Sequence, residues 1–104
     1  MYSIRCRAAA REYVGITTQP LRARFRQHMR GNRLMRRDRH RLNLTAADFR
    51  IRCLGTTTSP ATARRWERHT IAARRTLWPA GYDVLHGHPV TDSRFWAMLH
   101  SGSP

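Results

Sequence analysis

Positive charge is the feature of this sequence that most limits what it can be. Twenty arginines stand against six carboxylates among 104 residues, no residue is lysine, and the formal net charge is +14. A chain so charged must either tolerate self-repulsion or meet a polyanion. Nucleic acid is the leading partner class and an acidic membrane surface the second, because a guanidinium offers phosphate a planar fork of donors. The choice of arginine over lysine is equally consistent with the codon preference of a GC-rich genome.

The rest of the composition is that of a folded domain. Hydrophobic residues make up 40% of the chain, more than a solvated basic tail carries. The length allows one domain with one core. No apolar run approaches the ~18 residues of a membrane span, and none resembles a secretory signal. Cys6 and Cys53 are the only cysteines, so we expect two reduced, semi-buried thiols in a cytoplasmic (or nucleoid-associated) protein.

Residue alternation predicts three strands. Apolar Tyr2, Ile4 and Cys6 alternate with polar residues, and a second β-rich run over residues 12–16 follows a short alanine connection. This pattern is typical of a hairpin with one buried face. The same alternation over residues 49–53 predicts a third strand.

Capping and breaking residues predict the helices. A threonine pair at residues 17–18 as N-cap, Pro20 in the first turn and Gly31 as a stop predict a helix over residues 19–30. Similar signals predict two more helices, a short strand and a final helix, over residues 32–41, 60–75, 82–85 and 92–99 respectively. The order predicts an α+β fold, a small three-stranded antiparallel sheet flanked by helices.

Helical geometry places several polar side chains of the first predicted helix. At about 100° per residue, Arg24 and His28 share the edge of its apolar face, whereas Arg22 and Arg26 point away. Side chains at such an edge meet the margin of the sheet, where a cleft could form. The alternative is a snorkelling arginine beside an ordinary boundary histidine.

The third predicted helix contains Glu67, one of only two glutamates in the chain. The same geometry predicts a buried stripe around Trp66, with Glu67 on its shoulder and Arg64 and Arg68 facing solvent or a ligand. A carboxylate there is either an ion-pair partner or a ligand for a hard cation. Taken alone, the ion pair is favoured in so basic a chain.

These residues belong to an ordered set of short motifs. In chain order the motifs are Tyr2-Ser3-Ile4, Tyr13-Val14-Gly15, Leu21 with Arg24 and His28, Trp66-Glu67 with Ile71, and Gly81-Tyr82-Asp83. The set resembles the GIY-YIG nuclease family. That family has a Gly-Ile-Tyr strand, a Tyr-Ile-Gly strand, a helix with arginine and often histidine, a later glutamate, and a Gly-Tyr-Asn.

The resemblance covers most of the chain and implies an activity. It suggests a GIY-YIG-like nuclease domain over residues 1–88, with a C-terminal extension over residues 89–104 that carries a short helix packed on or flanking it. The implied function is a metal-dependent DNA endonuclease that hydrolyses phosphodiester bonds with one divalent ion, Mg²⁺ (or Mn²⁺). The implied partner is DNA, with RNA possible, and no membrane or small-molecule cofactor is expected.

The resemblance also assigns roles to five residues. Glu67 would hold the metal ion, and Arg24 would clamp the scissile phosphate. Tyr2 or Tyr13 would orient or deprotonate the attacking water, and His28 would take that proton or act as the base itself. The sequence leaves the choice of base among these three open. Further phosphate contacts are expected from exposed arginines of the first and third helices, namely Arg22, Arg26, Arg64 and Arg68.

Two departures from the family pattern bear on activity. Tyr2 directly follows the initiator methionine, so the first motif lacks its Gly-Ile and we expect a short or incomplete first strand. Asp83 replaces the usual asparagine, and its carboxylate could bind a second ion or pair with an arginine. Two alternatives to the enzyme are therefore retained: a non-catalytic basic DNA- or RNA-binding protein, explained by charge alone, and a degenerate nuclease fold that keeps only binding.

Overall fold

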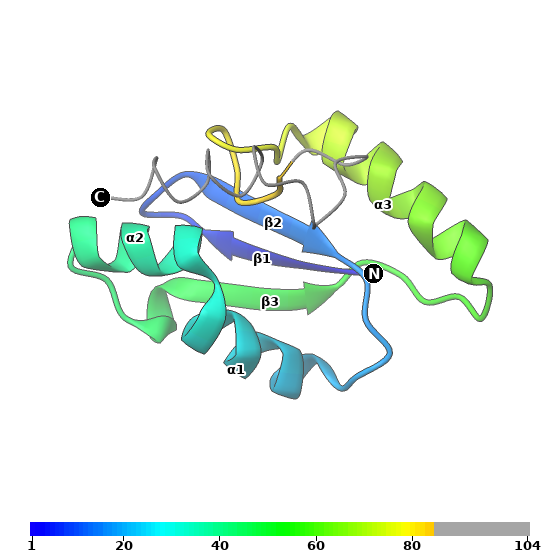
Figure 1. Cartoon of the computed structure of the whole chain (residues 1–104), viewed down its shortest axis with the longest axis horizontal. Helices are drawn as coiled ribbons and strands as arrows, with labels where there is room; N and C mark the ends of the chain where they lie inside the picture. Colours follow the sequence, from blue (N-terminus) through cyan, green and yellow to red (C-terminus); the bar gives the residue numbers. More distant parts are fainter. Residues whose placement is uncertain (85–104) are drawn as a thin grey trace, which may run out of the picture.

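Three strands form one antiparallel sheet whose first strand lies in the middle (Figure 1). The strands are β1 (Tyr2–Cys6), β2 (Arg11–Gly15) and β3 (Phe49–Cys53), in the order β2-β1-β3. The computed structural model describes residues 1–84, so the predicted final helix over residues 92–99 lies outside the described residues. All three predicted strands are confirmed.

Three α-helices and one short 3₁₀ helix complete the described fold. They are α1 (Leu21–Gly31), α2 (Arg33–Arg41), η1 (Ala46–Asp48) and α3 (Pro60–Arg74), which confirms the predicted α+β order. The predicted threonine cap of α1 is wrong. Pro20 is the capping residue and makes no side-chain bond, while Thr17 Oγ1 accepts a hydrogen bond from the backbone N–H of Gln19. The threonine closes a local turn instead of the helix.

One face of the sheet forms the hydrophobic core. The strand register aligns Tyr2 with Gly15 on one side and with Cys53 on the other, which sets the same face of all three strands toward α1 and α2. The buried core residues on this side of the sheet are Tyr2, Ile4, Cys6, Leu34, Met35, Phe49 and Tyr82. The incomplete first motif therefore does not prevent β1 from pairing along its whole length.

The helix α3 packs against β2, and its phase differs from the prediction. Trp66, expected in the buried stripe, is 37% exposed, whereas Ile71 is 3% exposed. The indole ring lies against Gly55, where an added Cβ would meet it at 3.3 Å. Ile71 is one helical turn after Glu67, so the glutamate lies on the face turned toward the sheet rather than on its shoulder.

A buried carboxylate joins α2 to the hairpin. Asp38 is fully buried, and Arg11 Nη1 donates to its two oxygens at 2.9 and 2.7 Å. Tyr82 donates its hydroxyl to the same carboxylate at 2.9 Å, and Arg41 contacts it at 3.3 Å. Because a buried charge is costly unless it is paired, this network fixes α2, β2 and the loop after α3 together.

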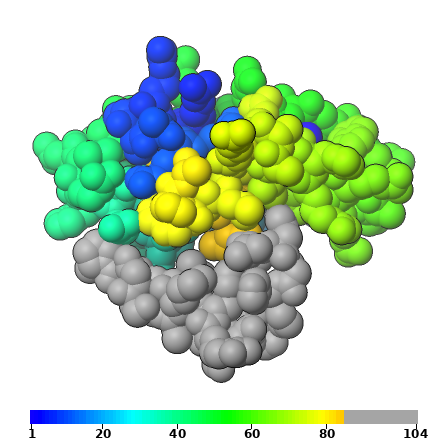
Figure 2. All heavy atoms as spheres, turned by 90° about the horizontal axis from the view of Figure 1, so that it is seen from above, coloured from blue at the N-terminus to red at the C-terminus, as the bar shows by residue number. Residues whose placement is uncertain are grey.

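The loop after α3 returns to the hairpin. In Figure 2 this loop, in yellow, fills the space between the blue hairpin and the yellow-green end of α3. Tyr82 donates its backbone N–H to Glu12 O at 2.9 Å, and a Cβ on Gly81 would lie 2.6 Å from the same oxygen. The predicted strand over residues 82–85 is wrong, because the only pairing in its described part is an isolated bridge between Leu77 and Asp83.

The cysteines and the length of the helices bear on the predicted thiols and on the predicted absence of a membrane span. Both cysteines are free, as predicted, but Cys6 is buried and Cys53 is exposed, so neither is semi-buried. None of the helices within residues 1–84 is long and apolar enough to cross a membrane.

Candidate active site

The hydroxyl of Tyr2 is the centre of the candidate site. Tyr2 begins β1 and is fully buried. Its oxygen lies 2.7 Å from His28 Nε2, and Arg24 Nε donates to it at 3.1 Å. Arg24 and His28 are one turn apart on α1, and from this shared side of the helix both reach the same phenol.

Tyr13 brings the second phenol of the motif to the same place. Its ring centroid lies 4.4 Å from that of His28 and 5.9 Å from that of Tyr2. Tyr13 is half-buried, whereas Tyr2 and His28 are buried. Tyr13 is therefore the member of this trio that presents surface to solvent.

Gly15 leaves the room in which the two phenols meet. A Cβ on this residue would lie 2.9 Å from Tyr2 Oη and 3.0 Å from Tyr13 Oη. It would also lie 2.7 Å from Tyr13 Cε1, closer than carbon atoms can pack. The glycine of the second motif is thus required by the approach of both hydroxyls to the backbone of β2.

The hydrogen bonds of Asn32 fix the protonation of His28. Asn32 Oδ1 accepts from the N–H of Met35 at 3.1 Å and so caps α2. Its amide nitrogen therefore donates to His28 Nδ1, at 3.0 Å. Burial, followed by the charge of Arg24, lowers the pKa of His28 from 6.5 to about 4, so the ring is neutral at pH 7. With Nδ1 accepting, the single ring proton lies on Nε2 and points at the oxygen of Tyr2.

The Tyr2 hydroxyl is hydrogen-bonded to that of Tyr13, and its oxygen consequently accepts hydrogen bonds from Arg24 and His28. Both donors favour the phenolate form. Burial acts in the opposite direction and outweighs them, so the pKa of Tyr2 is raised above its usual value of 10. The pKa of Tyr13 is raised further, by burial first and then by the neighbouring Tyr2 and Asp83. Both phenols are therefore protonated at neutral pH in the resting protein.

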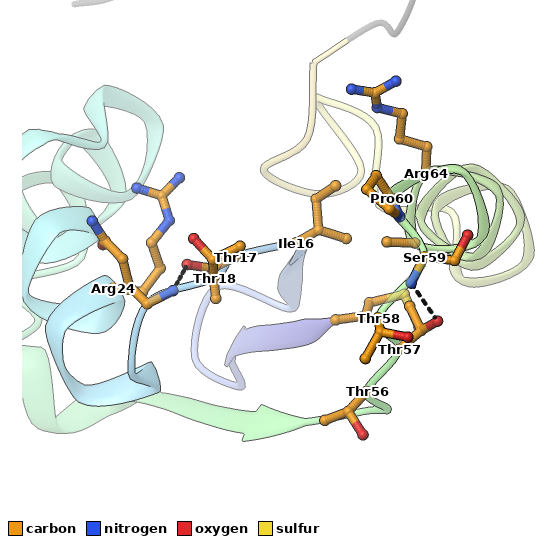
Figure 3. Close-up of a pocket in the computed structure, with 13 residues that line it drawn as sticks. Ile16, Thr17, Thr18, Arg24, Thr56, Thr57, Thr58, Ser59, Pro60 and Arg64 are labelled. Atoms are coloured by element: carbon orange, nitrogen blue, oxygen red, sulfur yellow. Dashed lines mark hydrogen bonds between the residues drawn. The ribbon is translucent and has the colours of Figure 1, made fainter.

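A cleft of about 560 Å³ opens beside Arg24 (Figure 3). The turn before α1 forms one wall and the start of α3 the other, and the cleft is lined by Thr17, Arg24, Ser59 and Arg64 among others. In Figure 3 the two arginines come from the opposite walls. Of the four arginines predicted to contact nucleic acid, Arg64 lines this cleft. The other three, Arg22, Arg26 and Arg68, are exposed and do not line it.

Asp83 lies within electrostatic reach of both phenols, and Glu67 lies within reach of Asp83. Asp83 is buried, and its Oδ2 accepts from the N–H of Val14 at 2.7 Å. Burial raises the pKa of Asp83 from 3.8 to about 7, and the charges of Glu67 and Glu12 act in the same direction. The Asp83 charge in turn raises the pKa of Tyr13. Asp83 is thus within electrostatic reach of Glu67 on one side and of the phenols on the other.

The carboxylates of Glu67 and Asp83 are compatible with one Mg²⁺ ion but not with a site that needs three or more protein ligands. Within the described part of the chain, no group of three or more histidine, cysteine, aspartate or glutamate side chains could hold a metal. Mg²⁺ commonly takes one or two carboxylates and completes its shell with water and substrate phosphate. The mutual repulsion of Glu67 and Asp83 is the kind that a bound cation relieves. Glu67, on the sheet-facing side of α3, fits the role of a single protein ligand.

Sequence reasoning missed two residues that support the site. Asn32 follows His28 by one helical turn, a spacing that could have revealed it, but it lies beyond the predicted stop at Gly31. Gln27 accepts a hydrogen bond from Arg24 Nη1 at 2.7 Å. Because Arg24 Nε is held by Tyr2, the guanidinium is fixed at two points before any ligand arrives.

Comparison with known proteins agrees with this arrangement. The family model of the GIY-YIG catalytic domain matches residues 1–83. No curated protein and no solved structure gives a significant match. The match covers most of the chain and includes every residue of the cluster described above. The chain therefore belongs to the GIY-YIG family of nuclease domains.

Proposed function

We propose that this protein is a metal-dependent endonuclease that hydrolyses phosphodiester bonds in DNA. The observation that carries the proposal is the convergence of Arg24, His28 and Tyr13 on the hydroxyl of Tyr2, beside a cleft with arginine on both walls. Membership of a nuclease family supports the class of reaction. The net charge of +14 supports a polyanionic substrate.

Arg24 clamps the scissile phosphate. Its Nε and Nη1 are held by Tyr2 and Gln27, and the side chain lines the cleft. A guanidinium fixed in advance stabilises the charge that develops on the phosphate without reorganising during the reaction. Arg64 on the opposite wall holds a neighbouring phosphate of the same strand.

The phenol pair with His28 handles the proton of the attacking water. Tyr13 contacts the water, because Tyr2 and His28 are buried and Tyr13 alone of these three keeps exposed surface. Loss of the Tyr2 proton to solvent places negative charge on the oxygen to which Arg24 and His28 already donate. Those two donors compensate the charge of the phenolate. Tyr13 then takes the proton of the water as it passes its own proton to this phenolate, to which it is hydrogen-bonded.

Glu67 would hold Mg²⁺ (or Mn²⁺) from α3, the helix whose start forms one wall of the cleft, although Glu67 itself does not line the cleft. The bound ion would neutralise charge that develops on the phosphate and its leaving oxygen. Asp83 serves chiefly to fasten the loop after α3 to β2 through the N–H of Val14. An asparagine could accept that hydrogen bond equally well, which accounts for the residue usual in the family.

Nicking of supercoiled plasmid with Mg²⁺, and with EDTA as control, tests the proposal. The wild type should nick, and Glu67→Gln should lose nicking while it still binds DNA. Glu12→Gln is the matched control. It removes the only other glutamate, which is paired with Arg74 at 2.8 Å, and it should retain nicking.

Two results would reject the enzyme. The first is nicking that survives in Glu67→Gln. The second is DNA binding with no nicking by the wild type at any concentration of Mg²⁺ or Mn²⁺. That second outcome would establish the other candidate function, a nuclease fold that only binds. The complete burial of the Tyr2 hydroxyl and the raised pKa of both phenols favour that alternative.

A further inference from the structure

A second basic surface lies on the opposite side of the sheet from Tyr2. Side chains alternate along a strand, so the residues between the core positions of β1 and β3 face the other way. Arg5 pairs with Arg50 across the two strands, and Ser3 pairs with Arg52. A groove of about 660 Å³ runs over these residues and includes Arg7. We call the four arginines at positions 5, 7, 50 and 52 the arginine groove. In Figure 2, dark-blue side chains from the start of the chain project at the upper edge of the view.

The guanidinium groups of the arginine groove have no protein partner within residues 1–84. All four residues are exposed, and none takes part in an ion pair there. The two carboxylates beside them are engaged elsewhere. Glu12 is paired with Arg74 at 2.8 Å, and Asp48 accepts the N–H of Thr45 at 2.8 Å. The groove therefore presents four positive charges against two carboxylates, and one of these, Glu12, is already paired with Arg74.

This arrangement is unfavourable for the folded protein alone. Like charges on directly opposed strand residues, as at Arg5 and Arg50, are destabilising. No packing requirement places arginine at these exposed positions. An anion held between the strands would remove the repulsion and satisfy the donors.

The pattern fits a nucleic-acid backbone better than a lipid surface. Arg50 and Arg52 are two residues apart on one strand, a separation of ~7 Å, and alternate phosphates of one DNA strand advance by ~7 Å along the axis. The one exposed large apolar side chain in the described structure is Trp66, which is not in the groove. A membrane-binding face would need apolar anchors beside its charges.

We propose that the arginine groove is a second DNA-contacting surface, which holds the phosphate backbone of a duplex segment on the side of the sheet away from Tyr2. The groove and the Tyr2 cluster lie on opposite faces of one sheet, so a straight duplex cannot lie along both faces. The segment in the groove is then a second duplex or a strongly bent continuation of the first. This surface binds DNA whether or not the cluster around Tyr2 cleaves it.

The test measures the salt dependence of DNA binding with the double variant Arg50→Gln/Arg52→Gln. Fluorescence anisotropy with a labelled 30-base-pair duplex, in EDTA, reads binding without cleavage. Loss of two phosphate contacts should lower the slope of log K against log salt by ~1.8 and weaken binding about tenfold at moderate salt. Arg50→Lys/Arg52→Lys keeps the charge and should keep the slope. The single variants Arg5→Gln and Arg50→Gln should each lower the slope by ~0.9, and they answer the question if the double glutamine variant does not fold.

Arg30→Gln/Arg36→Gln is the matched control, because it removes the same charge from exposed positions on α1 and α2. It should change the slope by less than about 0.5. Equal slopes for the control and the groove variant would overturn the proposal, since net charge alone would then explain binding. Loss of binding to anionic lipid vesicles with unchanged DNA binding would also overturn it. If the groove variant lowers the slope but the wild type never nicks plasmid, the groove is supported while the proposed nuclease activity fails.

Discussion

Replacing Asp83 by asparagine should make the protein more stable, and by an amount that depends on pH. The pKa of Asp83 is raised from 3.8 to about 7 in the folded chain, and burial is the largest cause of this shift. Well below pH 3.8 the carboxyl is protonated in both the folded and the unfolded state. Between pH 4 and pH 7 it ionises only when the chain unfolds, so the free energy of unfolding falls as pH rises. The difference in pKa corresponds to about 4 kcal/mol at pH 8.

Asparagine is a close substitute because its side-chain oxygen can accept the N–H of Val14, as Asp83 does at 2.7 Å. The variant and the wild type should therefore be about equally stable at pH 4. The variant should become more stable by up to about 4 kcal/mol at pH 8. Asp83→Ala cannot accept from Val14, so it should be less stable than the asparagine variant at every pH.

Urea unfolding followed by circular dichroism, in EDTA between pH 4 and pH 8, measures this effect. The difference between variant and wild type is the quantity to follow, because His28 acts in the opposite direction. The pKa of His28 is lowered from 6.5 to about 4, chiefly by burial, so its contribution to stability is lost as pH falls through that range. A difference between variant and wild type that stays constant from pH 4 to pH 8 would show that folding does not raise the pKa of Asp83.

Three further substitutions test other parts of the structure. Gly15→Ala should abolish nicking and destabilise the folded protein by about 1–3 kcal/mol, because the added Cβ would displace both phenols. Gly31→Ala is the control: its Cβ would have no neighbouring atom within 4 Å, so plasmid nicking should stay intact. Asn32→Ala should free the ring proton of His28 to leave Nε2 and should shift the pH profile of nicking. ¹⁵N NMR of the imidazole reports the position of the proton, and unchanged ¹⁵N shifts of the ring would argue against the assigned tautomer. Asp38→Ala should cost about 3–5 kcal/mol in thermal or urea unfolding, because it leaves buried partners unpaired, and a loss under 1 kcal/mol would contradict that role.

The strands, and the Arg24–His28 pair of the site, could be predicted because the sequence patterns that reveal them are local. Alternation along residues 2–6 and 49–53 depends only on which face of a strand is buried. Arg24 and His28 could be paired with each other because one helical turn separates them. The partner they share, Tyr2, could be placed only through the family resemblance, since long-range strand and helix packing brings it there.

The phase of α3 could not be predicted because its largest apolar residue is not its most buried one. Trp66 lies over Gly55, outside the main core, and Ile71 makes the buried contact instead. Hydrophobicity alone does not reveal whether a neighbouring glycine has left space for an indole ring. For the same reason Glu67 was predicted on the shoulder of the buried stripe, whereas it lies on the same helical face as the buried Ile71.

The twenty arginines show a different limit of sequence reasoning. Their charge indicates a polyanion, but identical residues do not reveal which of them face a cleft, a carboxylate or solvent. Arg11 is committed to the buried Asp38, Arg24 to the Tyr2 hydroxyl, and Arg50 to neither. Only the assembled sheet and loops separate these roles.

The rate of plasmid nicking by Arg24→Lys shows whether Arg24 acts on the scissile phosphate. Lysine keeps the positive charge but loses the Nε bond to Tyr2 and the forked contact with phosphate. Removal of one positioned donor in a preorganised site slows chemistry by about 10²–10³-fold, so Arg24→Lys should nick at least about 100-fold more slowly under single-turnover conditions. Arg26→Lys, on the exposed side of the same helix, should nick within about threefold of the wild type. Equal rates for the two lysine variants would contradict the assignment of Arg24 to the scissile phosphate, and with it the claim that the cluster around Tyr2 is the active site.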